Sequence, residues 1–237
     1  MHSEASRPVQ PRRHRAAEPR PDRRMAILLA AEKLFALRGY HAVSIRQIAD
    51  EAGVPLALVG YYFGTKQELF VAIFEHWNRT IEARLAALRA VRLDPADPAT
   101  LPAIVEAFVQ PVLALRASTE GEHYARLVAR QGGATDPEAD EVLRRYFDPL
   151  AHAYIDALHA ALPWATRAQV AWGYQFLLGA LLHHLADTRI TALSLGANRP
   201  ADPAAAPLLI RFIVGGLRAA LGDSAPLKPQ RSRRAAA

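Results

Sequence analysis

The chain has 237 residues, of which 51% are hydrophobic, enough for one large domain or for a small domain joined to a larger one. It contains no Cys, which excludes disulfides, thiolate metal sites and Cys nucleophiles and agrees with a reducing cytoplasm. The net charge of +6 lies in the two ends, because residues 1–24 carry +4, residues 223–237 carry +3 and the body between them carries −1. Basic tails on a near-neutral body are compatible with a polyanionic partner without establishing one.

Both ends of the chain have the composition of disordered segments. Residues 1–23 are rich in Pro and Arg and poor in aromatic residues, and residues 223–237 have the same character. Between them no alternating strand pattern occurs, so the sequence predicts an all-α fold. The first helix is expected over about 24–38, where it stops at Gly39.

Two short helices separated by a tight turn are predicted next. Ser44 has the pattern of an N-cap, with Gln47 completing a capping box, and a helix over 45–52 follows. Gly53 breaks that helix. The proline near the start of the next segment, 55–62, suits the first turn of a second short helix.

The rest of the body is predicted as longer helices. The longest covers about 66–92 and carries a stripe at helical core spacing: Leu69, Phe70, Ile73, Phe74, Trp77, Ile81, Leu85 and Leu88. Further helices are expected at about 100–117, 120–131, 137–162, 166–186 and 204–221. Pro111 and Pro149 fall within two of them and are expected to kink them.

The last two predicted helices, 166–186 and 204–221, are apolar on nearly every side in their central parts. One face of each can pack on its own domain, so we expect the other to form a two-fold homodimer interface; two central core helices of a monomer are the alternative. The longest apolar run, 170–182, is too short to span a bilayer, and the N-terminus lacks the apolar region of a secretory signal. A cytoplasmic protein without a membrane partner is therefore expected.

The segment 44–63 has the layout of a helix-turn-helix. Ala49 is small where a second helix would cross closely, Gly53 makes the turn, and Val54 fills the gap between the two helices. The second helix would then present its outer residues to the major groove of DNA.

Residues 25–70 resemble the DNA-binding domain of the TetR/AcrR family of transcription regulators. The matching residues are Ala31, Phe35, Gly39, Tyr40, Ser44, Ile45, Ile48, Ala49, Ala52, Gly53, Val54, Tyr62, Phe63, Lys66 and Leu69. The resemblance implies an all-helical homodimer that binds operator DNA and releases it when a small molecule enters the C-terminal domain. We therefore expect a three-helix DNA-binding domain at 24–66 and a larger ligand-binding and dimerisation domain at 67–222, and we expect the protein to be a repressor.

The resemblance also implies the DNA contacts. They are Ser44 and Arg46 from the first short helix, Leu56, Ala57, Gly60 and Tyr61 from the reading helix, and Tyr62 and Lys66 on the backbone. Leu56, Leu58 and Gly60 depart from the polar and aromatic residues usual in the family, which favours apolar contacts to thymine methyls. The alternative is a helical ligand-binding or scaffold protein whose helix-turn-helix no longer reads DNA. The Arg-rich arm either enters the minor groove or is a solvated tail.

Aromatic and His residues of the C-terminal domain are the candidates for a ligand pocket. They are Phe108, His123, Tyr124, Phe147, Tyr154, Trp172 and Phe176. Kinks at Pro111 and Pro149 would open space for such a pocket, and the scarcity of inward-facing charges favours an apolar or aromatic effector. No nucleophile elbow and no set of His ligands occurs in the sequence, so we expect neither an enzyme nor a metal site, and no cofactor.

Overall fold

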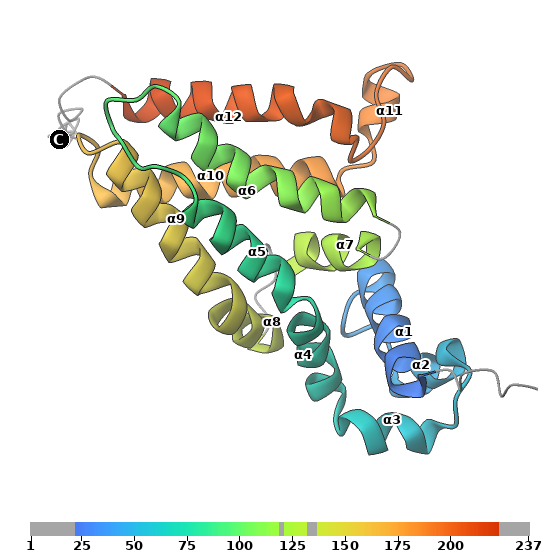
Figure 1. Cartoon of the computed structure of the whole chain (residues 1–237). Helices are drawn as coiled ribbons and strands as arrows, with labels where there is room; N and C mark the ends of the chain where they lie inside the picture. The colour runs from blue at the N-terminus through green and yellow to red at the C-terminus, as the bar shows by residue number, and fades with distance from the viewer. Residues whose placement is uncertain (1–21, 119–120, 132–136, 223–237) are drawn as a thin grey trace, which may run out of the picture.

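The computed structural model describes residues 22–118, 121–131 and 137–222, and every regular element in these ranges is helical (Figure 1). This confirms the all-α prediction. The helices are α1 (Arg23–Arg38), α2 (Ile45–Ala52), α3 (Leu56–Phe63), α4 (Lys66–His76), α5 (Asn78–Arg89), α6 (Thr100–Ala117), α7 (Glu122–Gln131), α8 (Pro137–Val142), α9 (Asp148–Ala161), α10 (Arg167–Ala186), α11 (Ile190–Leu193) and α12 (Ala206–Leu221). The two basic tails, apart from Asp22 and Arg23, lie outside the described residues.

The turn between α2 and α3 forms as the sequence predicts. The backbone N–H of Ser44 donates to Gln47 Oε1 at 2.8 Å, and the N–H of Gln47 donates to Ser44 Oγ at 3.3 Å, which completes the capping box. Gly53 ends α2 in the left-handed conformation, with φ 65° and ψ 34°, where a residue with a Cβ is strained. The N–H of Val54 then donates to the carbonyl of Ala49 at 3.0 Å and fixes the direction in which the chain enters α3.

The prediction of one continuous helix over 66–92 is wrong, because the chain breaks at Trp77 between α4 and α5. The carbonyl of Trp77 accepts from both the N–H and the hydroxyl of Thr80, each at 2.8 Å, so this turn tightens to an i+3 pattern. The Trp77 indole N–H also donates to the buried carboxyl of Glu32 in α1 at 2.7 Å. The break between α4 and α5 thus coincides with a tight turn and with an indole that is hydrogen-bonded to α1.

The predicted helix over 137–162 is also divided. The chain passes from α8 through one π-helical turn, Leu143–Phe147, into α9, whose second residue is Pro149. Pro149 has no N–H to donate, and the N–H of Asp148 instead donates to the carbonyl of Leu143, five residues back. The helix is therefore divided at Pro149 by a π turn, whereas α6 is one continuous helix through Pro111.

The helices form two connected parts. α1, α2 and α3 lie at one end of the molecule, and α4 and α5 lead from them into a bundle in which α12 is the outermost helix (Figure 1). α7 lies between the two parts, because it packs against α1 on one side and against α6 and α10 on the other. The buried apolar core is continuous from α1 through α4 into the bundle. The predicted boundary at 66/67 falls in the first turn of α4 and stays a prediction.

Two described segments, α6 and Pro203–Leu221, are long and apolar enough to cross a membrane by length and composition alone. Both pack along other helices of the bundle, α6 against α5, α7, α9 and α12, and α12 against α6 and α10. Core helices of helical proteins have the same composition, so this feature is weak evidence for a membrane segment. The short helix α11, which the sequence did not predict, follows a turn in which Asp187 accepts from the N–H of Arg189 at 2.9 Å.

Candidate functional site

The residues predicted to contact DNA lie at the exposed end of the helix-turn-helix. Seven of the eight predicted residues are exposed: Ser44, Arg46, Leu56, Ala57, Gly60, Tyr61 and Tyr62. The inner face of α3 is held by Val59 and Phe63, which are buried against α1 and α4. The seven exposed residues are therefore accessible to a partner, and their contact with DNA stays a prediction.

The outward face of α3 has few hydrogen-bonding groups. The side chains of Leu56 and Ala57 have no hydrogen-bonding group, and Gly60 has no side chain. Tyr61, in contrast, is 80% exposed and carries a phenolic hydroxyl. Its ring lies 5.2 Å from that of Tyr62 in an edge-to-face arrangement. Any reading of bases by this helix would therefore combine apolar contacts with the hydroxyls of the two tyrosines.

Lys66 differs from the other seven residues because it is half-buried. Its ammonium lies over the ring of Tyr40, 4.2 Å from the ring centre, at the first turn of α4. Arg24 is placed in a similar way, with its guanidinium 4.9 Å from the centre of the Phe63 ring. Both cations border the helix-turn-helix surface while resting on aromatic rings of its core.

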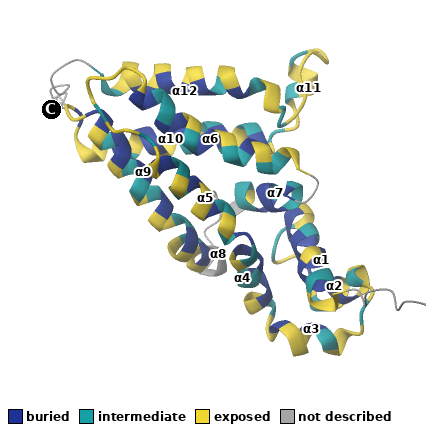
Figure 2. Cartoon of the chain, in the orientation of Figure 1, coloured by how far each residue is buried: buried dark blue, intermediate teal, exposed yellow. Residues whose placement is uncertain are grey.

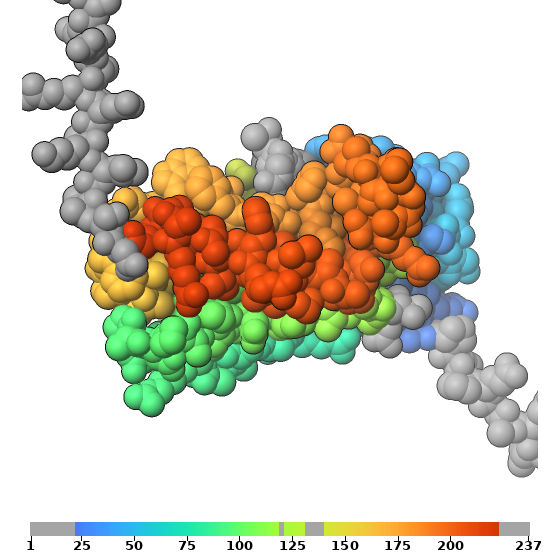
Figure 3. Space-filling model, turned by 90° about the horizontal axis from the view of Figure 1, so that it is seen from above, coloured from blue at the N-terminus to red at the C-terminus, as the bar shows by residue number. Residues whose placement is uncertain are grey.

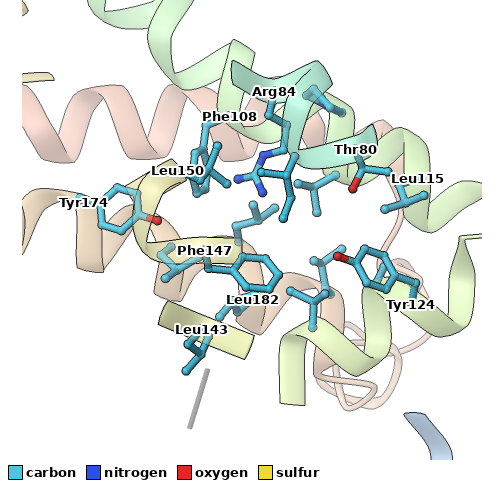
Figure 4. Close-up of a pocket in the computed structure, with 18 residues that line it drawn as sticks. Thr80, Arg84, Phe108, Leu115, Tyr124, Leu143, Phe147, Leu150, Tyr174 and Leu182 are labelled. Atoms are coloured by element: carbon cyan, nitrogen blue, oxygen red, sulfur yellow. The ribbon is translucent and has the colours of Figure 1, made fainter. Parts of the chain in front are cut away.

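A cavity of about 90 Å³ lies inside the bundle (Figure 4). Its wall is supplied by α5, α6, α7, α9, α10 and the π turn. Pro111 belongs to the lining, and so do two residues of the π turn that precedes Pro149. Its lining is apolar apart from four residues: Thr80, Arg84, Tyr124 and Tyr174. The rest of the wall consists mainly of leucines from α10 and of aromatic and aliphatic residues from the other helices.

The structure brings together only some of the predicted ligand residues. Phe108, Tyr124 and Phe147 line the cavity, and Tyr154 lies behind its wall, where its hydroxyl donates to the carbonyl of Arg84 at 3.1 Å. His123 instead lines a hollow beside α1. Trp172 and Phe176 are 63% and 64% exposed on the outer face of α10, away from this cavity. Their role as ligand contacts is untested, but this cavity does not include them.

Arg84 is not among the residues predicted for the pocket, and it is a charged side chain that faces inward where such charges were expected to be scarce. Arg84 is 8% exposed, and its guanidinium enters the cavity (Figure 4). The signal was present in the spacing, because Arg84 falls three residues after Ile81 and four before Leu88, on the apolar stripe of α5. A charged residue at a core position of an amphipathic helix is uncommon enough to mark a site.

Glu32 connects the helix-turn-helix to the neighbourhood of the cavity. Its side chain is 1% exposed, and burial raises the pKa of its carboxyl to about 7 against the lowering effect of the Trp77 and Tyr124 hydrogen bonds. The Trp77 indole, which donates to Glu32, also stacks on the Tyr124 ring at 5.2 Å and 16°. The Tyr124 hydroxyl reaches the cavity, so these three residues form a contact path from the cavity to α1.

Within the ranges that the structure describes, no group of three or more His, Asp or Glu residues is arranged to hold a metal ion. The geometry instead offers an exposed helix-turn-helix surface and an internal, largely apolar cavity.

Comparison with known families matches both parts of the chain. Residues 27–73 match the family model described as bacterial regulatory proteins, tetR family, and residues 106–216 match the tetracyclin repressor-like C-terminal domain. The two matches include the helix-turn-helix and most of the helices that surround the cavity.

Individual relatives agree with this assignment. The transcriptional activator FasR of Mycolicibacterium smegmatis is 37% identical over 91 residues, 38% of this chain and 40% of FasR. The transcriptional repressor NicS of Pseudomonas putida is 39% identical over 72 residues, 30% of this chain and 32% of NicS. The chain thus spans less than half the length of either curated relative in these matches.

Among solved structures, a TetR-like regulator from Rhodococcus sp. RHA1 has the same fold, with a TM-score of 0.56 and 24% identity over 84% of this chain and 98% of that one. Family matches to both parts, the helix-turn-helix geometry and the shared fold lead to one conclusion. The chain belongs to the TetR family of helix-turn-helix transcriptional regulators, which is a non-enzymatic family.

Proposed function

We propose that this regulator is a cytoplasmic, ligand-responsive repressor that binds operator DNA as a homodimer and releases it when a small molecule enters the cavity. The observation that carries the proposal is the position of α7. One side of α7 lines the cavity through Tyr124, Ala125 and Val128, and the other side packs against α1 of the helix-turn-helix. A molecule that displaces α7 therefore also displaces α1, against which α2 and the reading helix α3 pack.

The break at Trp77 gives this movement a second route. Trp77 joins α4 to α5, contacts Glu32 of α1 through its indole N–H and stacks on Tyr124. Displacement of Tyr124 by a ligand would act on this joint rather than on one rigid helix. In a dimer, two reading helices must lie about 34–36 Å apart to reach successive half-sites, so a small rotation at the joint is enough to weaken binding. We expect coupling of about 1–3 kcal/mol between ligand and DNA.

The homodimer is proposed on the outer face of α10 and α12. Both helices bury one face, and the opposite face exposes four large apolar side chains by more than 60%: Trp172, Phe176, Leu208 and Phe212. α12 lies uncovered across this side of the molecule (Figure 3). Gly215 and Gly216 on α12 are exposed as well, so a partner helix could approach the backbone closely. An apolar patch of this kind on two adjoining helices favours a self-complementary two-fold contact.

The burial pattern supports the same division of roles. In Figure 2 the exposed residues of α12 lie on its outer side, and those of α3 lie at the opposite end of the molecule. The proposed dimer face and the proposed reading surface are thus separate, and both can be occupied at once. The cavity lies in the bundle between them.

The proposal is tested by fluorescence anisotropy of the purified chain with DNA from upstream of its own coding region, repeated over a range of salt concentrations. We expect tight binding to one near-palindromic segment that resists non-specific competitor DNA. Weak binding to all fragments alike, lost with added salt, would contradict the proposal and favour a helical ligand-binding or scaffold protein with a helix-turn-helix that does not read DNA.

A further inference from the structure

We propose that the cavity binds an organic monocarboxylic acid, whose carboxylate pairs with Arg84 and whose compact apolar body packs against the leucines of α10. This assigns a chemical class to the effector of the same cavity, and it depends on the proposed function only for what binding does to DNA. The sequence alone favoured an apolar or aromatic molecule, and Arg84 adds a carboxylate to that expectation.

The first observation is that Arg84 is buried and has no ion-pair partner among the described residues. It is 8% exposed, and it is the one charged side chain among the 18 residues that line the described part of the cavity (Figure 4). Its Nε is buried and has no hydrogen-bond partner, and no ion pair of its guanidinium is found among the described residues. Removing a cation from water is costly unless an anion and hydrogen-bond acceptors replace the lost hydration.

The surrounding residues do not replace that hydration. Phe108 covers one face of the guanidinium, with its ring centre 4.2 Å away, which offsets only part of the cost of burial. Burial raises the pKa of Tyr124, and it raises that of Tyr174 to about 12, so both phenols are neutral. Burial also lowers the pKa of Arg84, but Arg stays charged at neutral pH.

Another arginine of the same bundle provides a contrast. Arg116 on α6 also has a buried Nε without a partner, but its Nη1 lies 3.3 Å from the carboxylate of Glu122. The charge of Arg116 is therefore balanced within the protein. The charge of Arg84 is left for a molecule that enters the cavity.

The shape of the polar groups favours a carboxylate. An Arg guanidinium presents a planar fork that binds the two oxygens of a carboxylate together. Tyr124 faces Arg84 from another wall, and its buried hydroxyl interacts with the Thr80 hydroxyl, so a carboxylate oxygen can accept from the phenol in place of that contact (Figure 4). Thr80 adds one further hydroxyl to the wall. Such a small set of donors suits a singly charged acid better than a phosphate dianion.

The remaining lining and the volume define the body of the ligand. The apolar part of the wall includes four leucines of α10: Leu178, Leu181, Leu182 and Leu185. A cavity of about 90 Å³ is smaller than the roughly 150 Å³ that holds a benzene ring in another protein, so even a ring or a short alkyl chain enters only if side chains of the wall move apart. A longer chain would have to displace these leucines or the side chains of the π turn.

The first test compares acids with neutral molecules of the same shape. Benzoate, phenylacetate and hexanoate are each titrated into the full-length protein without DNA, beside benzamide, phenylacetamide and hexanamide, by calorimetry and by thermal shift. We expect at least one acid to bind and to raise Tm in proportion to its concentration, with its amide at least about 30-fold weaker. This comparison needs no variant. Equal binding of acids and amides would overturn the proposal, as would the failure of all the acids to bind.

The second test uses Arg84→Met, which keeps much of the side-chain volume but removes the charge, with Arg89→Met at an exposed position of the same helix as the control. Arg84→Met should bind the acid at least about 30-fold more weakly and should have an unchanged or higher Tm without ligand, because no unpaired cation is buried. Arg89→Met should bind like the original protein. Unchanged acid binding by folded Arg84→Met would overturn the assignment of Arg84.

The two proposals fail in different ways. If acids bind through Arg84 but do not release DNA, the ligand class stands and the ligand-responsive repressor does not. If a neutral apolar molecule releases DNA from the original protein and from Arg84→Met alike, the repressor stands and the carboxylate site does not. Binding of a phosphate monoester such as phenyl phosphate through Arg84, with no binding of the carboxylates, would also overturn the assigned class.

Discussion

The buried carboxyl of Glu32 gives a prediction that can be worked out in magnitude. Glu32 lies in α1, is 1% exposed and accepts from the Trp77 indole N–H at 2.7 Å, and burial raises the pKa of its carboxyl from 4.5 to about 7. The folded state therefore prefers the neutral carboxyl. Its contribution to stability is fully present below about pH 4.5 and is lost as the pH rises through about 7.

The substitution Glu32→Gln removes this titration while keeping a carbonyl oxygen to accept from Trp77. Between pH 5 and pH 8 the free energy of unfolding of the original protein, relative to that of Glu32→Gln, should fall by about 2.5 kcal/mol. The assay is urea unfolding of both proteins at several pH values in this range. The absolute difference at one pH also contains the changed hydrogen bonds of the amide, so the dependence on pH is the informative quantity.

Other titratable side chains lie near Glu32. His76, Arg79 and His123 line the same hollow, as do Lys33 and Glu51, and all five are present both in the original protein and in Glu32→Gln. Glu51→Gln is the control. Glu51 is exposed, and the hydrogen bond from Lys33 lowers the pKa of its carboxyl, so its contribution is lost only at more acidic pH and its difference curve should be flat from pH 5 to pH 8. A flat curve for Glu32→Gln as well would refute the reasoning, because it would mean that Glu32 is ionised in the folded protein.

Three further predictions concern DNA binding, the turn and the dimer. Arg46→Ala, at an exposed position of α2, should weaken binding to all DNA sequences and lower the salt slope measured by anisotropy by about one, whereas Arg89→Ala in α5 should leave the slope unchanged. Gly53→Ala should lower the free energy of unfolding in urea by about 1 kcal/mol, because φ is 65° there, and Gly53→Asn should cost less; equal losses would argue against backbone strain as the cause. Phe212→Asp, at a side chain that is 69% exposed, should shift the protein from dimer to monomer in sedimentation velocity and weaken operator binding. An undisturbed dimer would exclude this face.

Local sequence was enough for the helix-turn-helix. Ser44 and Gln47 form their capping box within four residues, and Gly53 adopts the left-handed conformation that the turn requires. Such signals act between residues close in the chain, so they are present in the sequence as spacing. The apolar stripe from Leu69 to Leu88 was also predicted correctly as core, apart from Leu85, which is half-buried.

The tertiary structure decided the break at Trp77 and the contents of the cavity. The indole of Trp77 is held by Glu32, 45 residues earlier in the chain, and no periodicity within α4 and α5 reports that contact. Arg84 faces the cavity because helices far apart in sequence leave space around it, and Trp172 and Phe176 lie outside it because they occupy the outer face of α10. The sequence by itself determined the reading turn and most of the helical segments, since those depend on neighbours in the chain, but not the break at Trp77, the π turn before α9 or the short helix α11. Which side chains meet at the cavity depends on how the helices pack, and only the folded structure specifies that.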